Sequence, residues 1–259
     1  GYEINPVAWW TEKKSMDDIN LDVFEREFHQ LLDDVRNELR EYYTTIDPET
    51  GQECEVLYYF QSQIVPCFTC GEDVELFPRY QLAKSKKTRN GVLYCPNSDC
   101  EDRIIRFHGR DKGLDEGTVV ETNEGSIEVS EDGNEVCTTC GFEFDPMDGN
   151  AGYGKYTCSN GHTHQIKETL QRLDEKPKFK RFALQYVTPS GDKRFKEFDE
   201  DDRRRVDNAS EKLSEIESEV RIPEQRVPEG VSNHRSTEAL QKYNYEQFRQ
   251  LFTDRHLLT

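Results

Sequence analysis

Four short cysteine-bearing stretches constrain the fold of this chain more than any other feature. They read CFTC, CPNSDC, CTTC and CSNGHTH. Two thiolates separated by two residues can lie on one tight turn, here called a knuckle, and point at one ion, and two knuckles complete the tetrahedron of a structural zinc site. In a chain that otherwise has the composition of a cytosolic protein, these pairs predict metal ligation rather than disulfides.

Sequence proximity and the cost of loop closure favour local pairing of the knuckles, although crossed pairing is possible in principle. The first predicted site consists of Cys67, Cys70, Cys95 and Cys100. The second consists of Cys137, Cys140, Cys158 and His162, with His164 as the alternative fourth ligand. Gly71 and Gly141 directly follow two knuckles, where the turn often needs a positive φ. Cys54 lies outside both groups and is expected to be a partly buried thiol at a β-edge.

The composition explains why metal would be needed. Only 34% of residues are hydrophobic and 33% are charged, and the mean hydropathy is -0.93. The apolar supply is thin for one large core, so several small modules are expected. Zinc binding of roughly 10–16 kcal/mol can substitute for missing core. Neither group has a spare ligand position with a nearby Glu base of the HExxH kind, so the two zinc ions are expected to be structural.

The net charge of -18 and the pI near 4.8 oppose non-specific binding to a polyanion. A nucleic-acid surface must therefore be a local basic patch, and a high-salt habitat is one explanation of the acidity. The candidate patch is the stretch RYQLAKSKKTRN, whose cations are Arg79, Lys84, Lys86, Lys87 and Arg89. The alternative is an ordinary solvated loop. No run of about 18 apolar residues occurs, so no membrane partner and a cytoplasmic location are expected.

Periodicity predicts an α+β fold of amphipathic helices and hairpins. Apolar residues at steps of three and four predict helices over 21–43 and 201–220, and the last 17 residues also have a helical pattern. The stretch EVLYYFQSQIV is β-rich. Hairpins are predicted over 116–130, around Asn-Glu-Gly, and over 180–198, around the turn TPSGD.

The opening stretch GYEINPVAWW predicts the end of a strand followed by a helix. Asn5 is a good N-cap and Pro6 suits the first helical position. Glu3 then stands at the end of the strand, where doubly wound folds commonly place an acidic residue that binds a nucleoside ribose.

Several segments in order carry a family resemblance. These segments are, in order, the motif ExNPVA, the pair KK, EVLYYF, CFTCG, LFPRYQLAK, CTTCGFEF, SGDKR and LFTDRHLL. Together they resemble the large zinc-ribbon-containing adenine-specific DNA methylases of the DUF1156 type. These are S-adenosylmethionine-dependent DNA methyltransferases. The resemblance covers essentially the whole chain. His256 stands where that family usually has Gln, whereas Arg255, Leu257 and Leu258 agree with its pattern.

The resemblance implies that Glu3 contacts the ribose of S-adenosylmethionine, with Asn5 beside it. The family's glycine-rich cofactor loop and its DPPY-type catalytic motif do not occur in this chain. The chain is therefore expected to be two zinc-ribbon modules with hairpins and flanking amphipathic helices, inserted in a Rossmann-like methyltransferase domain that lies largely outside it. No catalytic residue and no activity are expected in this segment alone.

The implied partners are the rest of the methyltransferase polypeptide and DNA, in which the parent enzyme would methylate adenine N6 or, as the alternative, cytosine N4. The alternatives are a structural or partner-binding zinc-ribbon module and a ribbon protein of the transcription or RNA-handling type. The predicted organisation is an end of strand and start of helix over 1–16, a long helix and hairpin over 17–62, zinc ribbon 1 over 63–110, a hairpin linker over 111–135, zinc ribbon 2 over 136–166, a hairpin and helix over 167–221, and a linker with a returning helix over 222–259.

Overall fold

The computed structural model describes residues 6–84, 91–107, 119–122, 125–129, 135–137, 139–173, 178–220, 222–227, 240 and 243–258. The predicted site residues Glu3, Asn5, Lys86, Lys87 and Arg89 lie outside this part of the chain. The chain forms two compact units, Gly1–Glu41 and Tyr42–Thr259.

The first unit consists of two helices, α1 (Pro6–Ser15) and α2 (Leu21–Leu39). Pro6 takes the first helical position, as expected. Asn20 caps α2, because its side-chain oxygen accepts a 3.1 Å hydrogen bond from the backbone N–H of Val23. The predicted helix over 21–43 is confirmed, with its last turn tightened into the 3₁₀ helix η1 (Arg40–Tyr42).

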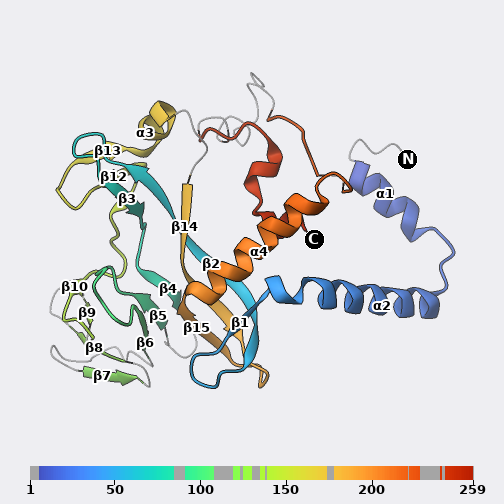
Figure 1. Cartoon of the computed structure of the whole chain (residues 1–259), viewed down its shortest axis with the longest axis horizontal. Helices are drawn as coiled ribbons and strands as arrows, with labels where there is room; N and C mark the ends of the chain where they lie inside the picture. The colour runs from blue at the N-terminus through green and yellow to red at the C-terminus, as the bar shows by residue number, and fades with distance from the viewer. Residues whose placement is uncertain are drawn as a thin grey trace. The chain divides into compact units, whose positions relative to one another are not determined.

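The second unit is built on one antiparallel sheet with the order β1-β2-β14-β15, in which β3 pairs with the far end of β2 (Figure 1). Its strands are β1 (Thr44–Ile46), β2 (Glu53–Pro66), β3 (Asp73–Leu76), β14 (Lys178–Val187) and β15 (Lys193–Glu197). The long ladder between β2 and β14 joins segments that are more than a hundred residues apart in the sequence. The predicted hairpin over 180–198 is confirmed, and Gly191 in its turn has a φ of 92°.

Apolar side chains from β2 and β14 form the core of this sheet. Val56, Leu184 and Tyr186 cluster with Cys54, which is 3% exposed. Cys54 pairs with Thr45 of β1, on the inner strand β2. The expectation of a partly buried thiol at a β-edge is therefore wrong: β1 covers that side of the strand, and the thiol is fully buried.

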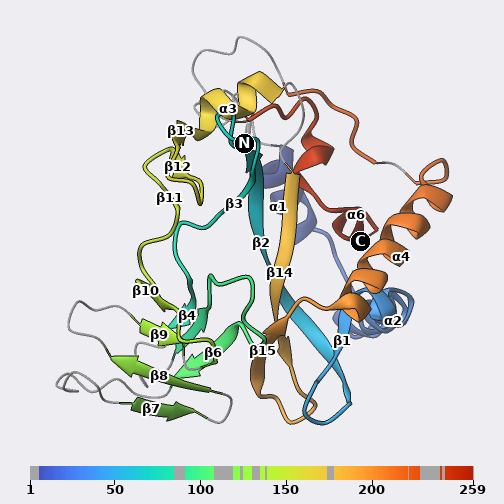
Figure 2. The ribbon, with the colours of Figure 1, turned by 60° about the vertical axis from the view of Figure 1, so that its left-hand side comes forward.

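Three smaller antiparallel sheets branch from the main one (Figure 2). The first contains β4 (Gln81–Lys84), β5 (Gly91–Tyr94) and β6 (Ile104–Phe107). The second contains β7 (Val119–Thr122), β8 (Gly125–Val129), β9 (Glu135–Cys137) and β10 (Glu143–Phe144). The third contains β11 (Ala151–Gly152), β12 (Lys155–Thr157) and β13 (Thr163–Gln165). The pair β7–β8 confirms the hairpin predicted over 116–130.

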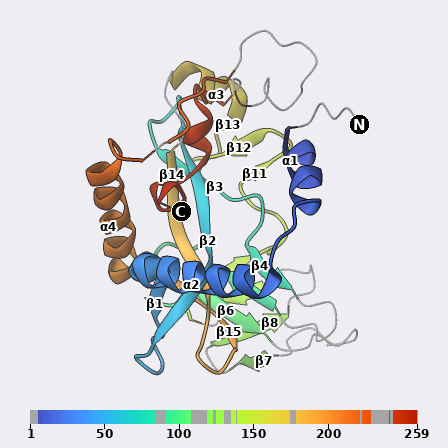
Figure 3. The ribbon, with the colours of Figure 1, turned by 90° about the vertical axis from the view of Figure 1, so that its right-hand side faces the viewer.

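Helix α3 (Ile166–Leu173) follows β13 directly and also contacts β2 (Figure 3). Leu170 of α3 is fully buried against Val65 and Tyr156, in a cluster that includes two of the cysteines, Cys67 and Cys158. The end of β2, the third small sheet and α3 therefore share one core.

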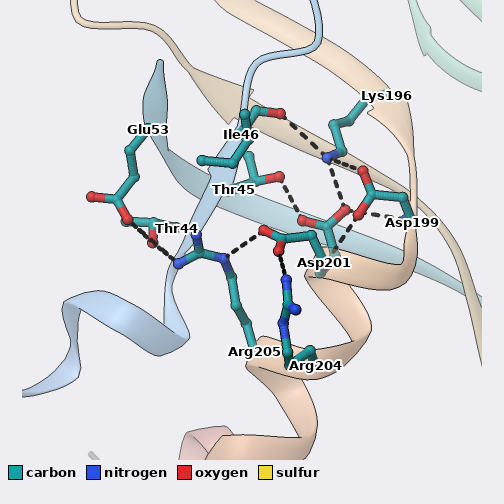
Figure 4. Close-up of polar contacts among 10 residues, drawn as sticks. Thr44, Thr45, Ile46, Glu53, Lys196, Asp199, Asp201, Arg204 and Arg205 are labelled. Atoms are coloured by element: carbon teal, nitrogen blue, oxygen red, sulfur yellow. Dashed lines mark hydrogen bonds and ion pairs between the residues drawn. The ribbon is translucent and has the colours of Figure 1, made fainter. Parts of the chain in front are cut away.

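Helix α4 (Glu200–Ile216) confirms most of the helix predicted over 201–220 but ends four residues earlier, and Val206, Ala209 and Leu213 are buried. A polar network fixes its first turn to β1 and β15 (Figure 4). Asp202 accepts a 2.5 Å hydrogen bond from Thr45 and lies 3.1 Å from the ammonium of Lys196. The same ammonium donates to Asp199, the N-cap of the helix.

The end of the chain differs from the prediction. A continuous helix was expected over the last 17 residues, but the described part contains the 3₁₀ helix η2 (Phe248–Leu251) and the short helix α6 (Asp254–Leu257). Gln247 forms an isolated β-bridge with Arg226, and both Gln247 and Thr253 have extended backbones, so the helix cannot run through them. In the described chain, the α+β class is confirmed, and no helix is both long and apolar enough to cross a membrane.

Candidate metal centres

Two groups of four side chains converge on points in the second unit. The outer centre consists of Cys67, Cys70, Cys158 and His162. The inner centre consists of Cys95, Cys100, Cys137 and Cys140. Within each group, the candidate ligand atoms all lie within 4.8 Å of one another. All eight residues predicted as metal ligands are brought together, four at each centre.

Strand ends position these ligands. Cys67 and Cys70 follow β2, and Cys158 and His162 connect β12 to β13. In the inner centre, Cys95 and Cys100 follow β5, and Cys137 ends β9. Each knuckle is therefore held by a hairpin whose register fixes the direction of its thiols.

Three of the four knuckles contain a glycine in the left-handed region. The φ angles are 79° at Gly71, 72° at Gly141 and 81° at Gly161. The backbone N–H of each of these glycines donates to the carbonyl of the cysteine that opens its knuckle. Gly71 and Gly141 were predicted from the sequence, and the Asn-Gly dipeptide within CSNGHTH is the signal that identifies Gly161.

Three sulfur–sulfur distances within the two centres match the edges of a tetrahedron around zinc. With Zn–S bonds of about 2.3 Å, ideal geometry places two sulfur atoms about 3.8 Å apart. The Sγ atoms of Cys95 and Cys140 are 3.6 Å apart, and those of Cys100 and Cys137 are 3.7 Å apart. In the outer centre, the Sγ atoms of Cys70 and Cys158 are 3.9 Å apart. The two centres could each hold a zinc ion with four protein ligands.

The pairing predicted from sequence proximity is wrong. Each predicted ribbon contributes one knuckle to each centre, so the inner centre is nested within the loop that the outer centre closes. Loop closure did not decide the pairing because each doubling of loop length costs only about 0.6 kcal/mol. Tertiary contacts outweigh that difference: the Asn150 side chain bonds the backbone N–H of Phe77 at 2.8 Å, and the Tyr156 hydroxyl donates to Pro66 O at 2.7 Å. These bonds hold the segment that carries Cys158 and His162 against the ends of β2 and β3.

His162 and His164 take different places at the outer centre. The Nδ1 atom of His162 lies 3.4 Å from Cys158 Sγ and 3.8 Å from Cys67 Sγ, as a fourth ligand requires. The Nε2 atom of His164 lies 3.2 Å from Cys67 Sγ and 3.4 Å from the Thr69 hydroxyl. His164 is therefore placed beside a ligand sulfur, in the position of an outer hydrogen-bond donor. The spacing of the two histidines in the sequence does not distinguish these roles.

The inner centre is the more enclosed of the two. Its cysteines pack with Leu93, Ile105 and Phe144, and only Cys140 is partly exposed. Burial, with the neighbouring Cys140 and Cys137, raises the pKa of Cys100 to about 12. Against the effect of its burial, the backbone N–H of Phe142 helps to lower the pKa of Cys140 to about 7. Four such thiols would not all ionise on their own near neutral pH, so a bound cation would be needed to keep them as thiolates.

Comparison of the chain with protein-family models, with curated proteins and with solved structures found no match.

The other predicted site residues are placed only in part. Arg79 is exposed next to β4, and Lys84 is the last residue of that strand. The remaining three cations of the predicted patch lie outside the described residues, so the patch stays a prediction. The predicted cofactor contacts Glu3 and Asn5 are likewise outside the described part of the chain.

Proposed function

We propose that the chain is an insertion module of an S-adenosylmethionine-dependent DNA methyltransferase, held together by two structural zinc ions. The observation that carries the zinc part is the convergence of eight ligands into two groups with tetrahedral spacing. Four protein ligands leave no open position for substrate or water, which is the arrangement of a structural site. The zinc ions fix the ends of hairpins that contribute few apolar side chains to a core.

The methyltransferase part is supported by the ordered resemblance of segments from NPVAWW to LFTDRHLL. In this proposal, the catalytic and most cofactor-binding residues belong to the rest of the polypeptide, and the module positions DNA or that polypeptide. The helix α2 suits docking against such a partner, because Phe24, Phe28, Leu31 and Val35 form an exposed apolar face. The proposed substrate of the parent enzyme is DNA, and the proposed reaction transfers the methyl group of S-adenosylmethionine to adenine N6.

Metal analysis tests the zinc part. Purified chain is expected to contain two equivalents of zinc, one for each centre. A strong chelator is expected to unfold the second unit, and circular dichroism would measure this unfolding. One equivalent or none in folded protein would reject the two-centre proposal.

Methyl transfer tests the enzymatic part. The product of the complete reading frame is expected to transfer tritiated methyl groups from S-adenosylmethionine to DNA, and this chain alone is expected to transfer none. Product analysis of the modified bases would then identify N6-methyladenine. Transfer by the isolated chain, or none by the complete product, would contradict the proposal.

A further inference from the structure

A cavity of about 240 Å³ lies beside the outer metal centre. It is bounded by the first knuckle, by the hairpin of β12 and β13, and by α3. Its lining includes Phe68, Lys155, His164, Gln165, Glu168 and Arg172. None of these residues was singled out as a binding residue by its sequence pattern, apart from His164 as a possible metal ligand.

The size of the cavity restricts its ligand. Pockets that enclose drug-sized ligands measure roughly 300–1,000 Å³. At about 240 Å³, this cavity suits a single planar ring with one attached group, rather than an extended cofactor such as S-adenosylmethionine. It is therefore a site distinct from the cofactor site proposed for the parent enzyme.

The chemistry of the lining favours an anionic ligand with an aromatic face. Phe68 is 44% exposed, although it is a large apolar side chain. The guanidinium of Arg172 lies 5.4 Å from the centroid of its ring. Lys155 and Arg172 provide two positive charges against one negative charge from Glu168, in a chain whose net charge is -18. An exposed ring with a guanidinium over it is a platform on which nucleic-acid bases stack.

We propose that this cavity binds one unpaired nucleotide of a single-stranded nucleic acid. The base stacks on Phe68 and Arg172, the amide of Gln165 and the carboxylate of Glu168 face its polar edge, and Lys155 attracts the phosphate. The proposal rests on the proposed zinc sites and on the proposed contact with DNA. It adds that the module recognises a single strand rather than a duplex. Single strands form wherever an enzyme extrudes a base or opens a duplex.

Zinc at the outer centre would preorganise the cavity. Phe68 stands between Cys67 and Cys70 in the first knuckle, so ligation of both thiols fixes its backbone on either side. His164 both lines the cavity and lies 3.2 Å from the Cys67 sulfur. Removal of the metal should therefore release the stacking platform, and nucleotide binding should depend on an intact outer centre.

Fluorescence anisotropy with labelled oligothymidylate and the zinc-loaded full chain tests the proposal. Phe68→Ala is expected to weaken binding about tenfold or more, the loss typical of one stacked base. Lys155→Gln is expected to weaken binding and to reduce the slope of log K against log salt by about 0.7, the value for one phosphate contact on a single strand. Competition by oligouridylate then tests whether the cavity binds single-stranded RNA, and competition by duplex DNA tests whether it binds a duplex.

Matched variants and metal content keep the outcomes distinct. Phe142→Ala removes a ring that is 43% exposed next to the third knuckle and should leave affinity unchanged. Arg203→Gln, an exposed charge change on α4, should also have little effect. Equal losses in Phe68→Ala and Phe142→Ala, or no binding by wild-type chain that holds two zinc ions, would overturn the nucleotide site while leaving the zinc centres intact. Tighter binding of the chain to duplex DNA than to oligothymidylate would overturn it as well.

Discussion

The guanidinium of Arg255 lies 4.2 Å from the ring centroids of both Tyr43 and Tyr59. One of its nitrogens donates to the carbonyl of Tyr42 at 3.3 Å, and the Tyr43 hydroxyl donates to the carbonyl of Arg255 at 3.1 Å. The side chain is 8% exposed and has no ion-pair partner among the described carboxylates. This one residue therefore joins α6 to the beginning of the second unit and to β2.

Replacing Arg255 should destabilise the second unit. Arg255→Ala is expected to lower the free energy of unfolding by about 3 kcal/mol, since it removes a desolvated cation from two aromatic rings and a hydrogen bond. Arg255→Lys keeps the charge but loses the planar stacking, so a loss of about 1–2 kcal/mol is expected. Urea unfolding measures both. Arg203→Ala, at an exposed position, is the control and should change stability by less than about 0.5 kcal/mol; an equal effect there would contradict the special role of Arg255.

The nested pairing of the metal centres predicts the zinc content of paired variants. Cys70→Ser combined with Cys158→Ser removes two ligands of the outer centre and should leave one zinc ion per chain at the inner centre. Cys70→Ser combined with Cys95→Ser removes one ligand from each centre and should deplete both. Elemental analysis after gel filtration measures the content. Local pairing would give the opposite result for each double variant.

His164 should tune the outer centre without ligating the metal. His164→Ala is expected to weaken zinc binding at that centre 10–100-fold, the usual effect of removing a hydrogen bond to a ligand, at about unchanged zinc stoichiometry. His162→Ala should instead lose the fourth ligand and about one equivalent of zinc. Competition with a chromophoric chelator separates these cases, with His29→Ala as the control. Loss of stoichiometry in His164→Ala alone would reverse the two assignments.

The buried pair of Asp202 and Lys196 should be needed as a pair. Asp202 is fully buried and Lys196 is 7% exposed. Asp202→Ala is expected to cost about 3–5 kcal/mol, because it leaves a buried ammonium with fewer partners and frees the Thr45 hydroxyl. Thermal or urea unfolding measures the loss. The double variant Asp202→Leu with Lys196→Met should lose less than the sum of its single changes; simple additivity would show that the two residues do not interact.

Asp47 should give the second unit part of its acid sensitivity. Burial alone would raise its pKa, but hydrogen bonds from the Glu49 backbone N–H and the Tyr186 hydroxyl outweigh burial and hold the pKa below its ordinary 3.8. Thr50 and Arg194 add to this effect. Because the unfolded chain binds this proton more tightly, the carboxylate stabilises the fold above about pH 4, and the stabilisation is lost as pH falls through the lowered pKa.

Asp47→Asn should therefore make stability change less between neutral and acidic pH. Unfolding in urea at a series of pH values measures the slope, with the exposed Asp207→Asn as the control. A slope as steep as that of the wild type would contradict the role of Asp47. The turn that holds this carboxylate lies in the stretch IDPETGQE, which connects β1 to β2.

Local features of the fold follow from the sequence because they depend on residues that are close together in it. The helical steps of Phe24, Phe28 and Leu31 predict α2, and the dipeptide Ser-Gly in TPSGD predicts the turn between β14 and β15. The spacing of the cysteines likewise predicts seven candidate metal ligands, and the histidines after Cys158 supply the eighth, His162 or His164. The prediction of a helix at the end of the chain is wrong for the opposite reason. Gln247 forms a β-bridge with Arg226, which is distant in the sequence, and no local sequence pattern encodes such a contact.

The sequence by itself determined which residues can bind metal and where α2, most of α4 and two of the hairpins form, since chemical type and short-range periodicity are local properties. Only the tertiary structure decided which knuckles converge on one candidate metal site, which histidine joins the candidate ligand group, and that Arg255 is buried between two tyrosines. The nesting depends on contacts such as the approach of Gly149 to Phe77, where any side chain would begin 1.8 Å from a carbonyl oxygen. Loop closure discriminates weakly between pairings, so packing of this kind, and not distance along the chain, selects the partner.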